Sequence, residues 1–169
     1  VLEFGVASGH CTKWWANRSV DIEVWHGFDT FSGLPSNWMR AGVPVMKKGF
    51  FSQTVNGGQT SVSKVKLPEL KKDFPVVWHV GLIQDTFRNG SHFLNSKQQS
   101  IVFIDVDLYE PTIHILKILS QTLKSGDLVY FDEAFDPWNE GKAIDEMKKE
   151  LPYMKALALT GSAFLVEVV

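Results

Sequence analysis

The chain has little cysteine, no excess of basic charge and no long apolar run, and each shortage excludes a class of protein. Cys11 is the only cysteine among 169 residues, so no disulfide can form within the chain and a cytoplasmic location is expected. The net charge of −2 leaves no basic face for nucleic acid. No apolar run reaches the roughly 20 residues of a transmembrane helix, and no charged-then-apolar leader opens the sequence. We therefore expect neither nucleic acid nor a membrane as a partner.

Two cofactor signatures are also missing from the sequence. No cysteines and histidines have the spacing of a zinc site, and no G-x-G-x-x-G segment marks a dinucleotide-binding turn. With 44% hydrophobic and 21% charged residues, the composition is that of an ordinary globular protein. We expect residues 1–169 to form a single domain with a sizeable core.

Short apolar runs rich in β-branched and aromatic residues alternate with helix-length segments. The predicted strands are residues 1–4, 23–28, 76–83, 100–104, 128–131, 155–160 and 163–169, and the predicted helices are 11–17, 111–123 and 140–151. This alternation predicts a Rossmann-like, doubly wound α/β fold, with a mostly parallel sheet and helices on both faces. Gly161-Ser162 is too short for a parallel crossover, so the last two strands should form an antiparallel hairpin.

Two stretches depart from this regular pattern. The segment 32–75 is too long for an ordinary connection, so we expect a lid, a binding loop or a small insertion, with Asn56-Gly57-Gly58 as a flexible tip. Residues 1–4 already have the apolar character of a central strand. Because native chains seldom begin inside such a strand, we expect N-terminal residues to be missing.

Carboxylates follow two neighbouring strands at the point where each strand should end. Asp105 and Asp107 follow one apolar run, and Asp132 and Glu133 follow the next. In open α/β sheets, ligands bind beyond the carboxyl ends of the strands. The four acids would repel one another unless a cation or ligand lay between them, and they exceed what helix capping needs. Hard oxygen ligands of this kind suit Mg²⁺ or Ca²⁺ rather than Zn²⁺.

The segment Glu3-Phe4-Gly5-Val6-Ala7-Ser8-Gly9 joins the first strand to the first helix. Its small residues let the backbone approach a ligand, while the helix N-terminus offers free N–H donors. A tight turn without any ligand is the alternative. Glu3 favours the ligand because a carboxylate at an apolar strand end needs a partner, and a ligand ammonium would serve.

Polar residues also follow the second and third predicted strands. Asp29, in the segment Gly27-Phe28-Asp29-Thr30-Phe31, stands where Rossmann-like folds place a carboxylate that binds ribose hydroxyls. The alternative for Asp29 is an Asx-type turn. Gln84 and Asp85 could meet an adenine edge, although helix capping by Asp85 explains that residue nearly as well.

Together these segments resemble class I S-adenosylmethionine-dependent methyltransferases, most closely the branch of macrocin O-methyltransferase and related sugar O-methyltransferases. The matching segments are Glu3–Gly9, Gly27–Pro35 (GFDTFSGLP), Asp85–Phe87, Ile104–Thr112 (IDVDLYEPT) and Phe131–Glu133. They occur in the family's order and span nearly the whole chain. The resemblance implies a seven-stranded sheet with an antiparallel last strand, bound S-adenosylmethionine and a divalent cation, commonly Mg²⁺. It also implies helices before the first strand, which we expect to be among the missing N-terminal residues.

The resemblance assigns roles to individual residues. The cofactor would be held by Glu3, Gly5, Ala7, Ser8, Gly9, Asp29, Thr30, Gln84, Asp85 and Asp105. The metal would be held by Asp105, Asp107, Asp132 and Glu133, with Asp105 and Asp107 as the catalytic pair. Which of these two is the metal ligand and which the base stays open. Glu133 stands where metal-binding relatives often carry a second Asp.

The sequence therefore predicts an O-methyltransferase that acts, with metal assistance, on a hydroxyl of a small molecule such as a sugar or glycosylated metabolite. One alternative is a non-catalytic, methyltransferase-like domain that only binds the cofactor. A second is a nicotinamide-dependent oxidoreductase, which the missing G-x-G-x-x-G disfavours. The expected partner is the small-molecule acceptor, with a second copy of the chain as an option.

Overall fold

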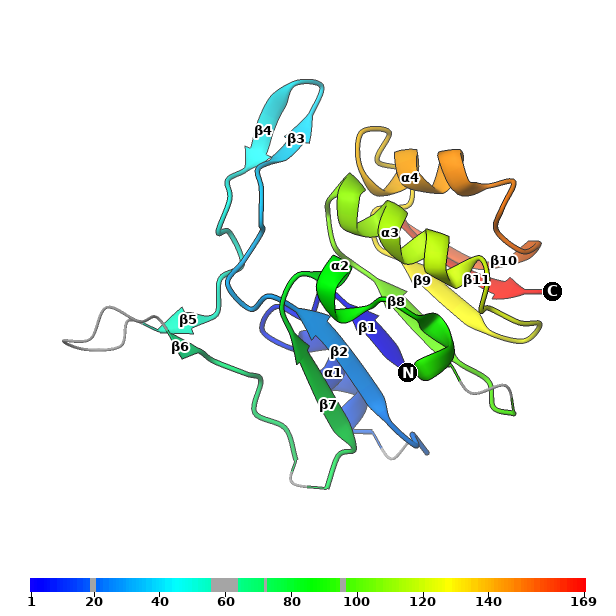
Figure 1. Cartoon of the computed structure of the whole chain (residues 1–169), viewed down its shortest axis with the longest axis horizontal. Helices are drawn as coiled ribbons and strands as arrows, with labels where there is room; N and C mark the ends of the chain where they lie inside the picture. The colour runs from blue at the N-terminus through cyan, green and yellow to red at the C-terminus, as the bar shows by residue number, and fades with distance from the viewer. Residues whose placement is uncertain (19–20, 56–63, 72, 95–96) are drawn as a thin grey trace.

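A seven-stranded sheet forms the centre of the computed structural model, which describes the chain except residues 19–20, 56–63, 72 and 95–96 (Figure 1). The strand order is β10-β11-β9-β8-β1-β2-β7. Its members are β1 (Leu2–Phe4), β2 (Trp25–Asp29), β7 (Val76–Val80), β8 (Ile101–Ile104), β9 (Leu128–Phe131), β10 (Met154–Thr160) and β11 (Ala163–Val168). β11 pairs antiparallel with β9 and β10, and the other pairs are parallel. The predicted fold class is confirmed, including the antiparallel last strand.

Helices cover both faces of this sheet. α1 (His10–Ala16) lies on one face, and α3 (Tyr109–Leu119) and α4 (Glu140–Met147) lie on the other (Figure 1). α3 buries one apolar stripe, Ile115, Leu116 and Leu119, in the main core, because positions three and four apart share a helix face. A short helix, α2 (Ile83–Thr86), and a 3₁₀ turn (Gly90–His92) connect β7 to β8.

The core behind the carboxyl ends of the central strands is rich in aromatic side chains. Phe4 and Phe28, on the adjacent strands β1 and β2, stack with ring centroids 4.8 Å apart, and Phe87 meets Phe4 edge-on at 4.7 Å. All three side chains are fully buried. These rings pack directly behind the ends of the central strands, so the turns that follow rest on a rigid base.

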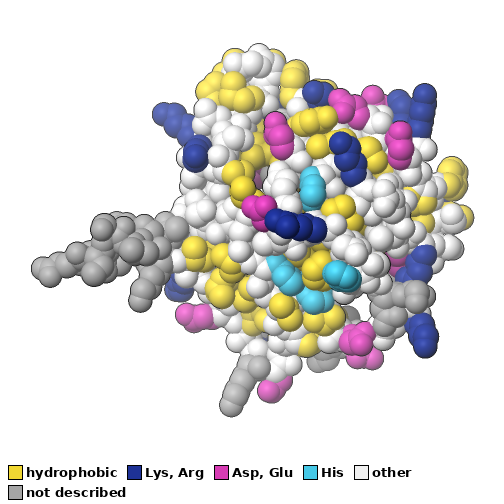
Figure 2. Space-filling view, in the orientation of Figure 1, with side chains coloured by type: hydrophobic (Ala, Val, Ile, Leu, Met, Phe, Trp, Pro, Cys, Tyr) yellow, Lys and Arg dark blue, Asp and Glu magenta, His cyan; other side chains and the backbone are white. Residues whose placement is uncertain are grey.

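The long segment 32–75 is an insertion that contains two small sheets of its own. One pairs β3 (Trp38–Arg40) with β4 (Val43–Met46), and the other pairs β5 (Thr54–Val55) with β6 (Lys64–Val65). Both project from the main sheet (Figure 1), and apolar side chains lie over the β3–β4 hairpin in the space-filling view (Figure 2). The predicted tip Asn56-Gly57-Gly58 lies outside the described residues.

Some predicted boundaries move for local reasons. The predicted strand 76–83 ends at Val80, because Gly81 adopts φ +150° and the chain enters α2 at Ile83. Gln84 and Asp85 therefore lie on a helix rather than at a strand end. Within the described part of the chain, no helix combines the length and apolar character needed to span a bilayer.

Candidate functional site

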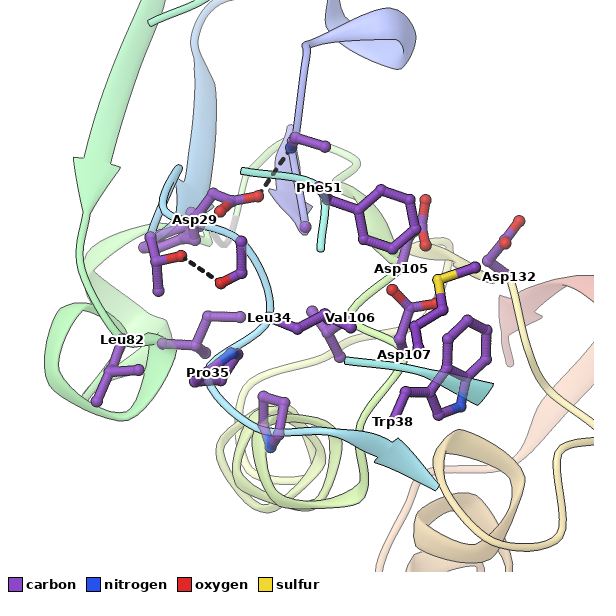
Figure 3. A pocket seen from close by; sticks show the side chains of 18 of the residues that line it. Asp29, Leu34, Pro35, Trp38, Phe51, Leu82, Asp105, Val106, Asp107 and Asp132 are labelled. Carbon is purple, nitrogen blue, oxygen red and sulfur yellow. Dashed lines mark hydrogen bonds between the residues drawn. The ribbon is translucent and has the colours of Figure 1, made fainter. Parts of the chain in front are cut away.

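A cavity of about 430 Å³ lies at the carboxyl ends of the central strands. Nine of the residues proposed from the sequence line it, namely Gly5, Ala7, Asp29, Thr30, Gln84, Asp105, Asp107, Asp132 and Glu133. Apolar residues of the insertion and of the α2 region complete the wall, including Leu34, Pro35, Trp38, Met46, Phe51, Leu82 and Ile83. Figure 3 shows Asp105, Asp107 and Asp132 near Phe51 and Trp38, with Asp29 and Leu82 toward the other end.

Gly5 brings the first strand's turn against the turn that follows β8. It adopts φ +87°, and a Cβ at this position would overlap the carbonyl oxygen of Asp105. Only glycine combines that backbone conformation with such an approach. The glycine is therefore required by the packing of the two turns, and its backbone lines the cavity.

Asp29 clamps the same turn from β2. Its Oδ2 accepts hydrogen bonds from the backbone N–H groups of Val6 and Ala7, each at 2.8 Å, and its Oδ1 accepts from Phe31 N–H at 2.6 Å. The bond to Phe31 is the Asx-type turn considered for this residue. The bonds to the first turn were not predicted. Asp29 nevertheless lines the cavity, where a carboxylate can accept additional hydrogen bonds.

Glu3 does not line the cavity. Its side chain is buried and accepts hydrogen bonds from Thr12 Oγ1 and from Trp25 Nε1, the latter at 2.7 Å. Burial raises the pKa of Glu3 to about 7. The expected ligand ammonium is therefore replaced by two neutral donors of the protein, which fix α1 and β2 to β1.

Three other proposed cofactor residues also lie outside the cavity lining. The Ser8 carbonyl accepts a hydrogen bond from Lys13 Nζ at 2.7 Å. Gly9 is the N-cap residue of α1 and packs against Pro68 of the insertion, where a Cβ would lie 2.6 Å from the Pro68 Cβ. Asp85 is exposed and pairs with Arg88 at 3.3 Å. The structure thus separates Asp85 from Gln84, its neighbour on the cavity wall.

The four carboxylates meet in the cavity as the strand ends predicted. Burial, followed by the charges of Asp132 and Asp107, raises the pKa of Asp105 to about 8. Burial, followed by the charges of Glu133 and Asp132, raises the pKa of Asp107 to about 7. Asp107 also adopts φ +60°, a left-handed conformation that few L-residues adopt. Perturbed carboxylates gathered in a cleft are typical of functional sites.

The insertion supplies a cation to this rim. Arg40, on β3, contacts Glu133 at 2.8 Å and Asp136 at 3.1 Å. Asp132 accepts a hydrogen bond from the Tyr130 hydroxyl at 2.7 Å. Glu133 is thus paired with Arg40, whereas the other three acids form no ion pair with this arginine. Across the described ranges, no group of three or more His, Cys, Asp or Glu side chains is arranged to hold a metal ion, so the predicted four-carboxylate metal site is not confirmed.

One buried acid at this rim was not anticipated. Glu140 is fully buried and accepts hydrogen bonds from the backbone N–H groups of Val106, Asp107 and Glu133 at 2.9, 3.2 and 3.1 Å. Burial raises its pKa to about 8. The sequence places it at the start of a predicted helix, where an acid ordinarily serves the helix N-terminus. No residue pattern marks its true partners, which are backbone groups of other elements.

Solved methyltransferase structures share this fold over 99% of the chain. The calicheamicin methyltransferase CalS11 matches with a TM-score of 0.68 and 23% identity, over 71% of its own chain. The O-methyltransferase NovP matches with a TM-score of 0.65 and 20% identity, also over 71% of its own chain. An apo structure of CalS11, described as a TDP-rhamnose 3'-O-methyltransferase, matches with a TM-score of 0.59 and 20% identity, over 70% of its own chain. No protein-family model matches the sequence, and a sequence search of curated proteins also finds no match.

The fold of this chain is therefore the Rossmann-like fold of these O-methyltransferases, as the motif resemblance predicted. The TM-scores of 0.59–0.68 establish a shared architecture, and identities of only 20–23% leave the chemistry to be argued from the cavity itself.

Proposed function

We propose that this chain is an S-adenosylmethionine-dependent O-methyltransferase that acts on a hydroxyl of a small molecule, such as a sugar or glycosylated metabolite. The observation that carries the proposal is the cavity at the strand ends. It combines a side-chain-free turn at Gly5 with the carboxylate of Asp29 and with Asp105 and Asp107, whose pKa values are raised. The fold shared with O-methyltransferases supports the same reading.

The cavity residues suit the parts of this cofactor. The turn at Gly5 and Ala7, where the side chains are a hydrogen and a methyl group, would take the methionine part, and Asp29 with Thr30 would accept from the ribose hydroxyls. Gln84, beside the apolar side chains of Leu82 and Ile83, would take the adenine. S-adenosylmethionine, when bound, supplies a methyl group already activated by its positively charged sulfur.

The remaining chemical task is to remove the proton of the acceptor hydroxyl. Asp105 or Asp107 would accept that proton on a carboxylate oxygen, while the bound cofactor would supply the methyl group that replaces it on the acceptor oxygen. A carboxylate whose pKa is raised toward neutrality is, in its ionised form, a better base than an ordinary one, because the proton it gains is bound more tightly. No described lysine, arginine or histidine forms an ion pair with either side chain, which leaves both available to the acceptor.

We also propose metal assistance, supported by the donor chemistry rather than by a formed site. Asp105, Asp107 and Asp132 offer the oxygen atoms that Mg²⁺ prefers, and their mutual repulsion would be relieved by a cation. Glu133 would join only after release of Arg40. A divalent cation, when bound, would lower the pKa of the acceptor hydroxyl.

The outer wall points to an acceptor with an extended apolar surface. Trp38 and Phe51, both from the insertion, face the acidic end of the cavity (Figure 3), and Met46 of the same insertion also lines the cavity. Aromatic rings pack well against the C–H faces of a sugar or against an aromatic aglycone, while the acids meet its hydroxyls. Nucleotide sugars and glycosides of aromatic compounds are therefore the first acceptors to test.

Turnover with labelled S-adenosylmethionine tests this proposal. We expect methyl transfer to at least one hydroxylated glycoside, detected by mass spectrometry, with a higher rate in Mg²⁺ than in excess chelator. Asp105→Asn should lower the rate, and the exposed control Asp145→Asn should not. Cofactor binding without transfer to any acceptor would instead support a non-catalytic cofactor-binding domain. Full activity in excess chelator would contradict the proposed metal assistance.

A further inference from the structure

We infer that Glu140 is a positioning residue for this site: its buried carboxylate holds together the two strand-end turns that carry Asp105 and Asp107 on one side and Asp132 and Glu133 on the other. The inference rests on the proposed function of this rim and adds to it a residue that does not line the cavity.

One carboxylate bridges both turns. Glu140 Oε1 accepts from the N–H groups of Val106 at 2.9 Å and Asp107 at 3.2 Å, in the turn after β8. Its Oε2 accepts from the N–H of Glu133 at 3.1 Å, in the turn after β9. Because Oε1 and Oε2 belong to one rigid group, a shift of either turn must be transmitted to the other.

The turn after β8 depends on such support. Asp107 adopts φ +60°, and the N–H of Leu108 bonds to the carbonyl of Val106 at 2.7 Å, which closes a tight turn. A non-glycine residue persists in this conformation only where its surroundings fix it. The bond from Asp107 N–H to Glu140 is one such constraint, and the direction of the Asp107 carboxylate follows from its backbone.

A second feature fixes the depth of Glu140. The next residue, Gly141, lies against the loop after β9, where a Cβ would come within 2.6 Å of the Ala134 carbonyl oxygen and 2.7 Å of the Asp136 carbonyl oxygen. The absence of a side chain at Gly141 therefore lets the start of α4 approach this loop closely. That approach carries Glu140 into the space between the two turns.

Helix capping does not explain this arrangement. An acid in the first turn of a helix ordinarily faces solvent and the free N–H groups of its own helix. Glu140 is instead fully buried, and its partners belong to the loops after β8 and β9. A buried carboxylate is retained at a cost in desolvation, which its hydrogen bonds to these loops offset.

The first test is hydrogen exchange at the three donor amides in Glu140→Gln, resolved by NMR. The glutamine side chain has the size of the glutamate, but an NH₂ group replaces one carboxylate oxygen. This NH₂ group then faces at least one of the three backbone N–H groups and cannot accept its hydrogen bond, so at least one bond is lost. We expect exchange at Val106, Asp107 or Glu133 to become roughly tenfold faster, the factor that corresponds to one lost hydrogen bond. Glu146→Gln is the matched control, because this acid of the same helix is exposed. Unchanged exchange at all three amides would overturn the inference.

The second test is kinetic and separates positioning from general stability. Glu140→Gln should lower kcat by roughly tenfold or more while the Kd for S-adenosylhomocysteine stays within about twofold, because the cofactor end of the cavity is held by Asp29 instead. A kcat equal to that of the wild type would contradict the inference. So would a loss of kcat that matches a loss in the fraction of protein able to bind S-adenosylhomocysteine, because that would indicate general unfolding.

A third variant keeps the inference testable if Glu140→Gln does not fold. Glu140→Asp retains the charge but is one methylene shorter, so it can serve only one of the two turns. Exchange should then be faster in the other turn, and unchanged exchange in both would count against the inference. If the wild type transfers no methyl group at all, the proposed function fails, whereas the exchange data still decide whether Glu140 holds the turns.

Discussion

Removing the carboxylate of Asp29 should destabilise the protein in a graded way. Its two oxygens accept hydrogen bonds from three backbone N–H groups, those of Val6, Ala7 and Phe31. Asp29→Ala leaves all three donors without this acceptor. Asp29→Asn retains one oxygen, which can stay with Val6 and Ala7, so only the Phe31 bond is lost.

The magnitude follows from these contacts. Hydrogen bonds to a charged group contribute about 1.5–3 kcal/mol each, but three bonds to one carboxylate are not additive and water can reach part of the turn. We therefore expect a loss of about 3 kcal/mol in the free energy of unfolding for Asp29→Ala and about 1.5 kcal/mol for Asp29→Asn. The alanine loss is a large part of the roughly 5–15 kcal/mol of an ordinary domain.

Urea unfolding followed by circular dichroism measures both values. With a slope of about 2 kcal/mol/M, the midpoint should fall by about 1.5 M for the alanine variant and by about 0.7 M for the asparagine variant. Equal midpoints for the two variants, or an alanine midpoint within about 0.3 M of the wild type, would refute the role of Asp29 as a clamp between β2 and the first turn.

Two further predictions concern other parts of the fold. Gly5→Ala should prevent stable folding, because its Cβ would overlap the Asp105 carbonyl oxygen. Gly126→Ala, at φ +90° with open space around it, should lower the free energy of unfolding by only about 1 kcal/mol. Equal melting temperatures for the two variants would contradict this prediction. His26 and His79 lie with ring nitrogens 3.1 Å apart, and burial lowers the pKa of His26 to about 4 and also lowers that of His79. On these two histidines the unfolded chain binds more protons below about pH 6.5, so their contribution to stability should fall as the pH drops from about 6.5 toward 4, opposite to that of acids with a raised pKa such as Asp105. In urea titrations the stability of the wild type relative to His26→Asn should therefore fall over this pH range.

The parts of the fold that sequence patterns predict best are those dictated by local chemistry. The strand predicted at 128–131 coincides with β9, because the apolar run is bounded by Gly126-Asp127 and by the acids that follow. The closing hairpin follows from the two-residue turn. The convergence of Asp105 with Asp132 required only that parallel strands end at the same edge of the sheet.

The features that sequence patterns miss depend on partners from distant elements. Trp25 Nε1 and Thr12 satisfy Glu3, so a carboxylate that appeared to need a ligand has protein partners. Asp29 and Glu140 bind backbone N–H groups, which every residue except proline carries and which therefore leave no residue signature. Their roles appear only once the turns are placed in space.

Titration of the protein with S-adenosylhomocysteine tests the central claim most directly, because the residues 84 and 85 give a matched pair. Gln84 lines the cavity, whereas Asp85 is exposed and pairs with Arg88. By calorimetry we predict binding to the wild type, binding roughly tenfold weaker to Gln84→Ala and unchanged binding to Asp85→Ala, with no binding of NAD⁺. A folded wild type that binds no S-adenosylhomocysteine, or that binds NAD⁺ equally well, would contradict the account.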